Sequence, residues 1–286
     1  VSFIDFAPTV LHLAGIEVPS HMDGSPFLGP QIDLERVNER DQAFGYADRF
    51  DEKIDHVRSL RKGKFKYIRN YQPFNVDGLW NDYRYIMLAY QEWWQLFRSG
   101  ELNEIQSQFF EARPPEQLFD LESDPHELQN LAGDLDYGEI LTDMRSSLSR
   151  KVKSINDLSM FPESMLLEEA FEDPVTFGRN NSNRISRLVD TADLSLRDFD
   201  SAREEIDSAL NDEDPWQRYW ALIVLSSFGE QANSFAQRAN DIAQSDDENL
   251  VRLRAIEFLA LIGRENPSQL LPALLITAAN EVDATI

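Results

Sequence analysis

The densest group of polar side chains lies in the segment ADRFDEKIDHVR, residues 47–58. Three of its residues, Arg49, His56 and Arg58, could bind an anionic substrate, and Asp51 beside them is a further candidate for substrate binding. A guanidinium group can bind an oxyanion through two parallel hydrogen bonds, and an imidazole can donate or accept one. We take Arg49 and Asp51 as the leading pair for such binding. The competing interpretation, which the pattern favours, is an ion-pair network between neighbouring strands.

A run of basic residues in an otherwise acidic chain is a second candidate. It consists of Arg58, Arg61, Lys62, Lys64, Lys66 and Arg69. Such a patch could attract a polyanion by raising its local concentration. These residues are interleaved with four apolar ones, Val57, Leu60, Phe65 and Tyr67, as is typical of strands with one face in water. The pattern therefore favours solvated hairpin positions over a polyanion site.

The remaining candidates are histidines and aromatic residues. His126 follows Asp124 and Pro125, so we expect a turn or a helix start capped by Asp124, with His126 on the surface. His12 and His21 have no partner pattern. A set of aromatic residues could form a wall on which sugar rings stack, although packing of an inserted helix is the favoured interpretation. The set is Trp80, Tyr83, Tyr85, Tyr90, Trp93 and Trp94.

Composition limits the possible partners. With 51 Asp plus Glu against 27 Lys plus Arg, the formal charge is −24, which argues against a nucleic acid or an anionic membrane held by bulk electrostatics. The chain has no cysteine, and therefore no disulfide, thiolate zinc site or cysteine nucleophile. No run approaches the roughly 18 to 20 apolar residues of a membrane span. We expect a fragment of a longer protein, because Val1 opens directly into an amphipathic element.

Apolar periodicity and turn residues locate the elements that would position these candidates. We expect helices in residues 1–16, from Tyr83 to Gly100, and from Tyr137 to about Ser154. Strands are expected after Asp41, turning at Gly63, and again in EQLFDL, residues 116–121. A loop rich in Pro, Gly, Ser and Asp occupies residues 17–30.

The last third of the chain contains an internal repeat with a period of 34 residues. Identical pairs are Asp212 and Asp246, Arg218 and Arg252, Ala221 and Ala255, Leu225 and Leu259, and Gly229 and Gly263. Each unit is predicted to be an Asp-rich turn, a helix ended by Gly and a second helix, which buries its apolar face only against a neighbouring unit. Residues 188–210 could form a degenerate first unit, and residues 267–279 the second helix of the last.

Three segments resemble the sulfatases of the alkaline-phosphatase superfamily. VSFIDFAPTVLHLAG carries the family pattern D-x-x-P-T-x-x-x-x-A-G and is followed by the Gly24-Ser25 loop. HVRSLRKGKFKYIRN resembles the family's V-R-x-x-R-x-x-x-x-K-Y-I-x-N hairpin. FDLESDPHELQNLA resembles its Y-D-L-x-x-D-P-x-E-x-x-N-L-A signature. The segments occur in the family's order, and the likeness is greatest to arylsulfatase-like and heparan-sulfamidase-like members.

The resemblance implies an enzyme that hydrolyses sulfate esters, most simply of sulfated polysaccharides or oligosaccharides. Such enzymes use a formylglycine nucleophile, made from the Cys or Ser of a C-x-P-x-R or S-x-P-x-R motif, and a Ca²⁺ ion. Neither motif occurs in this chain. We therefore assign no catalytic residue and no metal ligand here, and expect the chain alone to be inactive. The substrate would contact Arg49, Asp51, His56 and Arg58.

The implied fold is the carboxy-terminal portion of an α/β sulfatase, with a small antiparallel sheet and packed helices, followed by an α-solenoid of HEAT-like repeats. The expected domains are the end of the catalytic domain in residues 1–40, a carboxy-terminal subdomain in 41–158, a linker in 159–187 and the repeats in 188–286. The repeats could dock a protein or another domain. The family likeness implies a periplasmic or secreted location.

Two alternatives remain open. One is a phosphatase or phosphodiesterase of the same superfamily, with a Thr or Ser nucleophile and two metals. The other is a non-catalytic binding protein in which the helical repeats do the work. The sequence upstream of Val1 would distinguish all three, because the formylglycine motif belongs to sulfatases alone among them.

Overall fold

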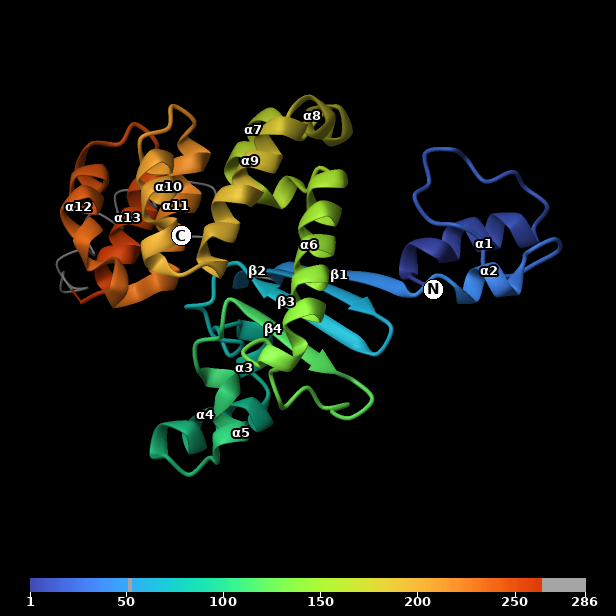
Figure 1. Ribbon diagram of the computed structural model, residues 1–286, viewed down its shortest axis with the longest axis horizontal. Coiled ribbons are helices and arrows are strands. Elements are labelled where there is room, and N and C mark those ends of the chain that lie inside the picture. Colours follow the sequence, from blue (N-terminus) through green and yellow to red (C-terminus); the bar gives the residue numbers. More distant parts are fainter. Residues whose placement is uncertain (51–52, 264–286) are drawn as a thin grey trace. The chain divides into compact units, whose positions relative to one another are not determined.

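The computed structural model describes residues 1–50 and 53–263 (Figure 1). The chain divides into two compact units. One consists of Val1–Tyr46, Arg58–Ile68 and Gln117–Arg145, and the other of Ala47–Val57, Arg69–Glu116 and the chain from Ser146 onward. No helix in the described part of the chain is both long enough and apolar enough to cross a membrane.

The strands form a four-stranded sheet in sequence order. The strands are β1 (Gln42–Phe50), β2 (Lys53–Lys62), β3 (Phe65–Asn70) and β4 (Glu116–Asp120). The N–H of Asn70 donates to the C=O of Pro115 at 2.9 Å and that of Leu121 to Lys64 at 2.8 Å, so β3 and β4 run antiparallel. Gly63 adopts a left-handed φ of 57° in the turn between β2 and β3, which confirms the predicted hairpin.

The amino-terminal helix holds the loop that follows it. In α1 (Phe6–Leu13) and the turn before it, the carboxylate of Asp5 accepts from the N–H of Ser25 at 2.9 Å, and Thr9 Oγ1 accepts from the N–H of Phe27 at 3.2 Å. A side chain at Gly24 would lie 2.0 Å from the C=O of Ile4. The motif residues Asp5, Thr9 and Gly24 therefore fix backbone, and the expected helix and loop are confirmed.

The helix α6 (Gly138–Ser154) follows the periodicity predicted for it. Its buried residues are Leu141, Met144, Leu148 and Val152, spaced three or four apart on one stripe. In the first unit, Lys62 Nζ donates a hydrogen bond to the carboxylate of Asp143 at 2.8 Å. The ring centroids of Phe65 and Tyr137 are 6.1 Å apart. The start of α6 thus lies against the β2–β3 turn.

The aromatic segment forms short helices where one long helix was predicted. They are α3 (Asp82–Tyr85), α4 (Leu88–Ser99) and α5 (Glu104–Ser107). Asn81 caps α3 through the N–H of Arg84, and the backbone of Met87 is extended, so the predicted helix is broken before Leu88. Gly100 ends α4 with a φ of 73°, as expected. No helix starts at Asp124, because its carboxylate instead accepts from the N–H of Gln129 in a turn.

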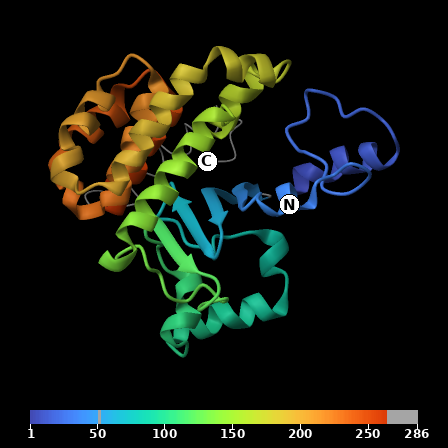
Figure 2. The same cartoon turned by 45° about the vertical axis from the view of Figure 1, so that its right-hand side comes forward.

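Helices fill the described chain beyond α6. They are α7 (Glu163–Glu169), α8 (Pro174–Asn180), α9 (Ser182–Ala192), α10 (Phe199–Leu210), α11 (Pro215–Phe228), α12 (Ala236–Ser245) and α13 (Asn249–Leu261). Figures 1 and 2 show α9 to α13 stacked side by side, and α11 packs against α9, α10 and α13. The stretch 159–187, predicted as a linker, contains α7, α8 and the start of α9.

A similar ion pair occurs twice near the 34-residue repeat, with its arginines 34 residues apart and its aspartates 32 apart. Arg184 on α9 makes two bonds of 2.7 Å to the carboxylate of Asp214, and Arg218 on α11 makes bonds of 2.7 and 2.8 Å to that of Asp246. The loop glycines Gly229 and Gly263 both have left-handed φ angles, of 56° and 67°. An arginine of α9 therefore binds the turn before α11, and an arginine of α11 binds the turn before α13.

The HEAT label, the solenoid and the bounds of the four predicted segments stay predictions, and residues 267–279 lie outside the described part of the chain. A four-stranded antiparallel sheet with packed helices is the architecture predicted for the sulfatase-like part.

The repeated ion pair gives a stability test. Asp246→Ala leaves the guanidinium of Arg218 buried, since the two side chains are only 6% and 16% exposed. Removing one partner of a buried pair costs about 3 kcal/mol. Arg197→Ala is the control, because Arg197 and Glu205 are exposed and such pairs contribute less than about 1 kcal/mol. Urea unfolding that gave equal losses for both variants would contradict this assignment.

Acid should weaken the same helices. Burial raises the pKa of Asp214, but bonds from Arg184 and from the N–H of Trp216 outweigh it, and the pKa lies below its ordinary value. Such a carboxylate contributes stability that is complete above its unfolded pKa, near 4, and lost as pH falls through the folded pKa. Asp214→Asn keeps an oxygen for capping but no charge. We expect a lower melting temperature at neutral pH and a shallower acid decline from about pH 5 to pH 3.

Candidate functional site

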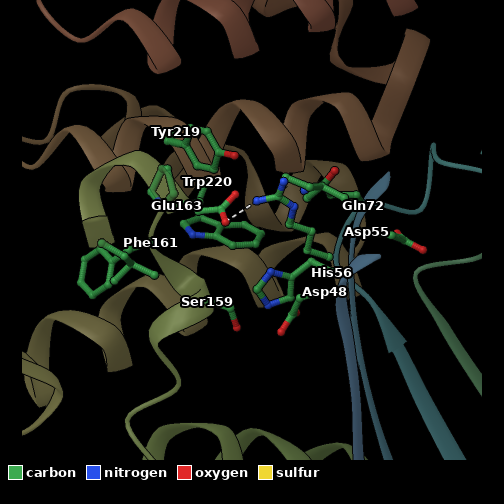
Figure 3. Close-up of a pocket in the computed structure, with 13 residues that line it drawn as sticks. Asp48, Asp55, His56, Gln72, Ser159, Phe161, Glu163, Tyr219 and Trp220 are labelled. Atoms are coloured by element: carbon green, nitrogen blue, oxygen red, sulfur yellow. Dashed lines mark hydrogen bonds and ion pairs between the residues drawn. The ribbon is translucent and has the colours of Figure 1, made fainter. Parts of the chain in front are cut away.

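A pocket of about 200 Å³ lies within the second unit (Figure 3). Its apolar lining comes from Ile54 on β2, Phe161, Leu166 on α7, and Tyr219 and Trp220 on α11. Its polar lining consists of Asp48, Arg49, Asp55, His56, Gln72, Ser159 and Glu163. The site thus combines aromatic surface with hydrogen-bonding groups, which is the composition of pockets that bind small polar ligands.

Aromatic packing fixes the deep part of the pocket. Trp220 Nε1 donates to the C=O of Met160 at 2.8 Å. The ring of His56 meets Trp220 edge-on at 5.4 Å and Tyr71 at 4.9 Å. His56 is carried by β2, whose C=O at this residue accepts from the N–H of Tyr71 at 2.9 Å. The imidazole of His56 is therefore buried and packed against Tyr71, which follows β3, and against Trp220 on α11.

An ion pair is part of the polar lining. Arg49 Nη1 on β1 bonds Glu163 Oε1 at the start of α7, as the dashed line in Figure 3 shows. The side chains are 50% and 36% exposed, so both reach solvent. Glu163 Oε2 is buried, and none of the described residues donates a hydrogen bond to it. The pair therefore offers a ligand a cation that reaches solvent, and Glu163 Oε2 keeps accepting capacity at a buried position.

Asp55 belongs to a buried ion cluster. Arg113 binds both oxygens of Asp55, at 2.6 and 2.7 Å, and reaches Asp77 at 3.1 Å. Burial by itself lowers the pKa of Arg113. The hydrogen bonds that Arg113 donates to Asp55 and the negative charge of Asp55 outweigh this effect, so the pKa of Arg113 lies above its ordinary value. Burial lowers the pKa of Lys53, whose Nζ lies 3.8 Å from Asp55. The negative charge of Asp55 is therefore balanced by the neighbouring Arg113 and Lys53, as is typical of a structural ion-pair network.

The structure places the four predicted ligand-binding residues differently. Arg49 and His56 both line the pocket. Arg58 is 1% exposed and does not line it, and its guanidinium lies 5.9 Å from the ring of Tyr46. Asp51 lies outside the described residues. The substrate-binding assignment of all four stays a prediction.

Sequence reasoning missed the far side of the pocket. Phe161 and Glu163 lie in the stretch interpreted as a linker, and Trp220 lies in the helical repeat. Proline at 162 followed by Glu163 is an ordinary helix start, and Trp220 fits the buried stripe of α11. Neither position carries a local signal for binding, since their proximity to β1 and β2 arises only in the folded chain.

The basic run is largely engaged within the protein. Lys64 bonds Asp120 at 2.7 Å, Lys66 bonds Glu127 at 2.7 Å, and Lys62 bonds Asp143. The hydrogen bond between Lys64 and Asp120 raises the pKa of the lysine and lowers that of the carboxyl. The side chains of Lys62, Lys64 and Lys66 reach solvent, being 41%, 42% and 29% exposed, as the favoured interpretation required for hairpin positions.

Two members of that run are buried, contrary to the expectation of solvated positions. Arg58 shares the inward face of β2 with His56 and Leu60, and Arg69 shares that of β3 with Tyr67, because strand side chains alternate with a period of two. The sequence did not show which residues face inward, because basic residues occupy positions on both faces of these strands. His126 is exposed as expected, and His12 Nε2 lies 2.8 Å from the C=O of Pro30, which holds the loop after α1.

Comparison with known proteins identifies the family. No protein-family model matches the chain. A curated ulvan-active sulfatase of Formosa agariphila is 40% identical over 204 residues, covering 68% of this chain and 34% of the relative. A second ulvan-active sulfatase of that organism is 26% identical over 166 residues, covering 55% and 30%. A solved 2-O GAG sulfatase shares 21% identity over 54% of this chain and 25% of that chain, with a TM-score of 0.34.

The chain belongs to the sulfatase family, on the strength of its curated sequence relatives. It spans about one third of the length of those relatives. The 68% of this chain covered by the first relative is longer than residues 1–158, so the similarity extends into the helices beyond α6. The sulfatase relationship therefore includes part of the chain that no sequence motif had suggested.

The ion cluster beside the pocket can be tested for a structural role. Asp55→Ala leaves the buried guanidinium of Arg113 with the carboxylate of Asp77, which is half exposed, and we expect a loss of about 3 kcal/mol in the free energy of unfolding. Asp77→Ala keeps the two-bond contact with Asp55 and should cost less than about 1 kcal/mol. Chemical denaturation of both variants provides the comparison, and an Asp55 variant as stable as the parent would contradict the network assignment.

Proposed function

We propose that this chain is the carboxy-terminal part of a sulfatase that hydrolyses sulfate esters of a polysaccharide, and that it supplies part of the substrate-binding surface. The observation that carries the proposal is the 40% identity with an ulvan-active sulfatase across two thirds of the chain. Ulvan is therefore the first polymer to test. Because a polymer of this kind meets an enzyme outside the cytoplasm, the proposed location is the periplasm or the cell exterior.

Formylglycine and Ca²⁺ would be supplied by residues outside this chain. The chain has no cysteine and neither form of the formylglycine motif. Across residues 1–50 and 53–263, no group of three or more His, Asp or Glu side chains is arranged to hold a metal ion. The residues present do not fit either group, so no step of the hydrolysis is assigned to them.

The exposed stripe of α1 supports association with further sulfatase structure. Phe6, Val10 and Leu13 recur at helical spacing and are 51%, 64% and 57% exposed. An amphipathic helix normally buries such a stripe, and this burial is worth about 25 cal/mol per Å². We propose that α1 packs against the remainder of the catalytic domain, as the last helix of that domain.

Within the chain, the pocket is the proposed contact with substrate. Arg49 would bind an anionic group of the sugar, either its ester sulfate or a carboxylate, through two hydrogen bonds. His56 and Glu163 Oε2 would form hydrogen bonds with hydroxyl groups of the sugar, whereas Trp220, which is 1% exposed, would hold the ring of His56 in place. The proposal assigns binding to Arg49 and His56, with Glu163 added from the structure.

The activity test compares this chain with the gene product that includes the upstream sequence. We expect the longer protein to release sulfate from an aryl sulfate and from ulvan, and this chain alone to release none. Sulfate release by this chain alone would contradict the proposal. Hydrolysis of phosphate esters in preference to sulfate esters would favour the phosphatase alternative. Polymer binding by a full-length protein without any hydrolysis would favour the binding-protein alternative.

Substitution of Arg49 tests the pocket within the longer enzyme. Arg49→Met removes the cation from a half-exposed ion pair, so stability should change by less than about 1 kcal/mol. We expect KM for the polymer to rise about tenfold, corresponding to the loss of one charge-assisted contact, with kcat little changed. Lys62→Met is the matched control, because Lys62 is also half exposed and ion-paired but does not line the pocket. Equal KM values for the two variants would exclude Arg49 from substrate binding.

A further inference from the structure

The aromatic segment divides into a packed part and an exposed part. Trp93 stacks on Phe109 at 4.4 Å, and Trp94 and Phe97 contact Phe110 at 5.3 and 4.7 Å. Trp80 is different, since it is 62% exposed. The favoured interpretation of the set as helix packing therefore describes the residues of α4 but leaves Trp80 without an explanation.

The indole of Trp80 is held in one orientation. Its ring lies on that of Tyr85 at 4.7 Å with an angle of 4° between the planes. Its Nε1 donates to Asp82 Oδ1 at 2.7 Å. Tyr85 is itself fixed, because it is 6% exposed and its hydroxyl donates to the C=O of Gly78 at 2.7 Å. Two contacts thus set the plane of an aromatic ring that remains on the surface.

One face of the Trp80 ring is available to a ligand. Because Tyr85 covers one face, the exposed area must lie on the opposite face and the edges. An aromatic face carries partial negative charge, and the C–H groups on the flat face of a sugar ring carry partial positive charge, so the two attract in addition to excluding water. A ring that is already oriented loses little conformational entropy when it binds.

We propose that Trp80 is a stacking platform for a sugar ring of a polysaccharide chain. The sugar class rests on the proposed sulfatase function, whereas the platform itself rests on the geometry of Trp80, Asp82 and Tyr85. Asp82 and the hydroxyl of Tyr83, whose side chain is 69% exposed, lie next to it in sequence and can bond sugar hydroxyls. Trp80 does not line the pocket that contains Arg49.

Charge gives a second reason for stacking. The chain carries a formal charge of −24, so bulk electrostatics repels a sulfated polymer. Cations of the basic run are bonded to carboxylates of the protein, as with Lys64 and Asp120 or Lys66 and Glu127. A neutral aromatic contact holds such a polymer without requiring free positive charge, and its strength depends little on salt.

The test is the binding of ulvan by this chain, measured by the retardation of the protein in native gels that contain the polymer. Trp80→Ala leaves the charge unchanged, so a change in mobility reports binding. We expect about fivefold to tenfold weaker binding, the range given by one aromatic contact. Trp80→Phe should retain most of the affinity. Retardation of the parent chain should persist at roughly 0.5 M salt.

Leu88→Ser is the matched control. Leu88 is 80% exposed, so this variant removes exposed apolar surface close in sequence to Trp80 without removing a ring. Its binding should equal that of the parent. Equal losses in Leu88→Ser and Trp80→Ala would show general apolar contact and overturn the platform, as would an absence of ulvan binding by the parent chain or dimerisation that depends on Trp80.

A measurement without substitution covers a variant that fails to fold. N-bromosuccinimide oxidises accessible tryptophans, and peptide mapping then reports the oxidation of each of the five. Ulvan should protect Trp80, and oxidation of Trp80 at an unchanged rate would overturn the proposal. None of these outcomes requires hydrolysis, so failure of the sulfatase activity is observed separately from failure of the platform.

Discussion

The second unit depends on the hydrogen bonds that the buried guanidinium of Arg69 donates. Arg69 lies at the end of β3 and is 1% exposed. Its nitrogens donate to the C=O of Ala192 at 2.7 Å, to Ser195 Oγ at 2.8 Å and to Asp193 at 3.2 Å. A buried charge costs several kcal/mol unless it is bonded in this way. The end of α9 must therefore stay against the strand, which fixes the helices relative to the sheet residues of this unit.

The pocket is a consequence of that anchor. Arg69 lies 4.5 Å from the ring of Tyr71, and Tyr71 contacts His56 and Trp220 edge-on. His56 on β2 and Tyr71 thereby form one aromatic cluster with Trp220 on α11. The ion pair of Arg49 and Glu163 adds to the polar lining of the pocket. Substrate binding at this site would therefore depend on the guanidinium of Arg69, which does not line the pocket. The exposed Trp80 lies outside this arrangement and is oriented by its contacts with Tyr85 and Asp82.

Sequence patterns predicted those parts of the structure that depend on neighbouring residues. The β2–β3 hairpin, the stripe of α6 and the glycine that ends α4 follow from local periodicity and turn chemistry. The burial of Arg69 could not be predicted, because it depends on acceptors at the end of α9 more than a hundred residues away. The same holds for Glu163, whose role beside Arg49 arises only when the helices pack. Asp5 and Thr9 were recognised by their motif, but that they fix the following loop became clear only from their hydrogen bonds.

The central claim is that this chain provides a sugar-binding pocket to a sulfatase, and the most direct measurement is a crystal structure of the full-length protein with a sulfated oligosaccharide of ulvan. The account predicts a sugar ring in the pocket, with an anionic group bonded to Arg49 and a hydroxyl bonded to Glu163. An oligosaccharide bound in the enzyme at full occupancy, with the ion pair of Arg49 and Glu163 intact and no sugar atom in the pocket, would contradict it.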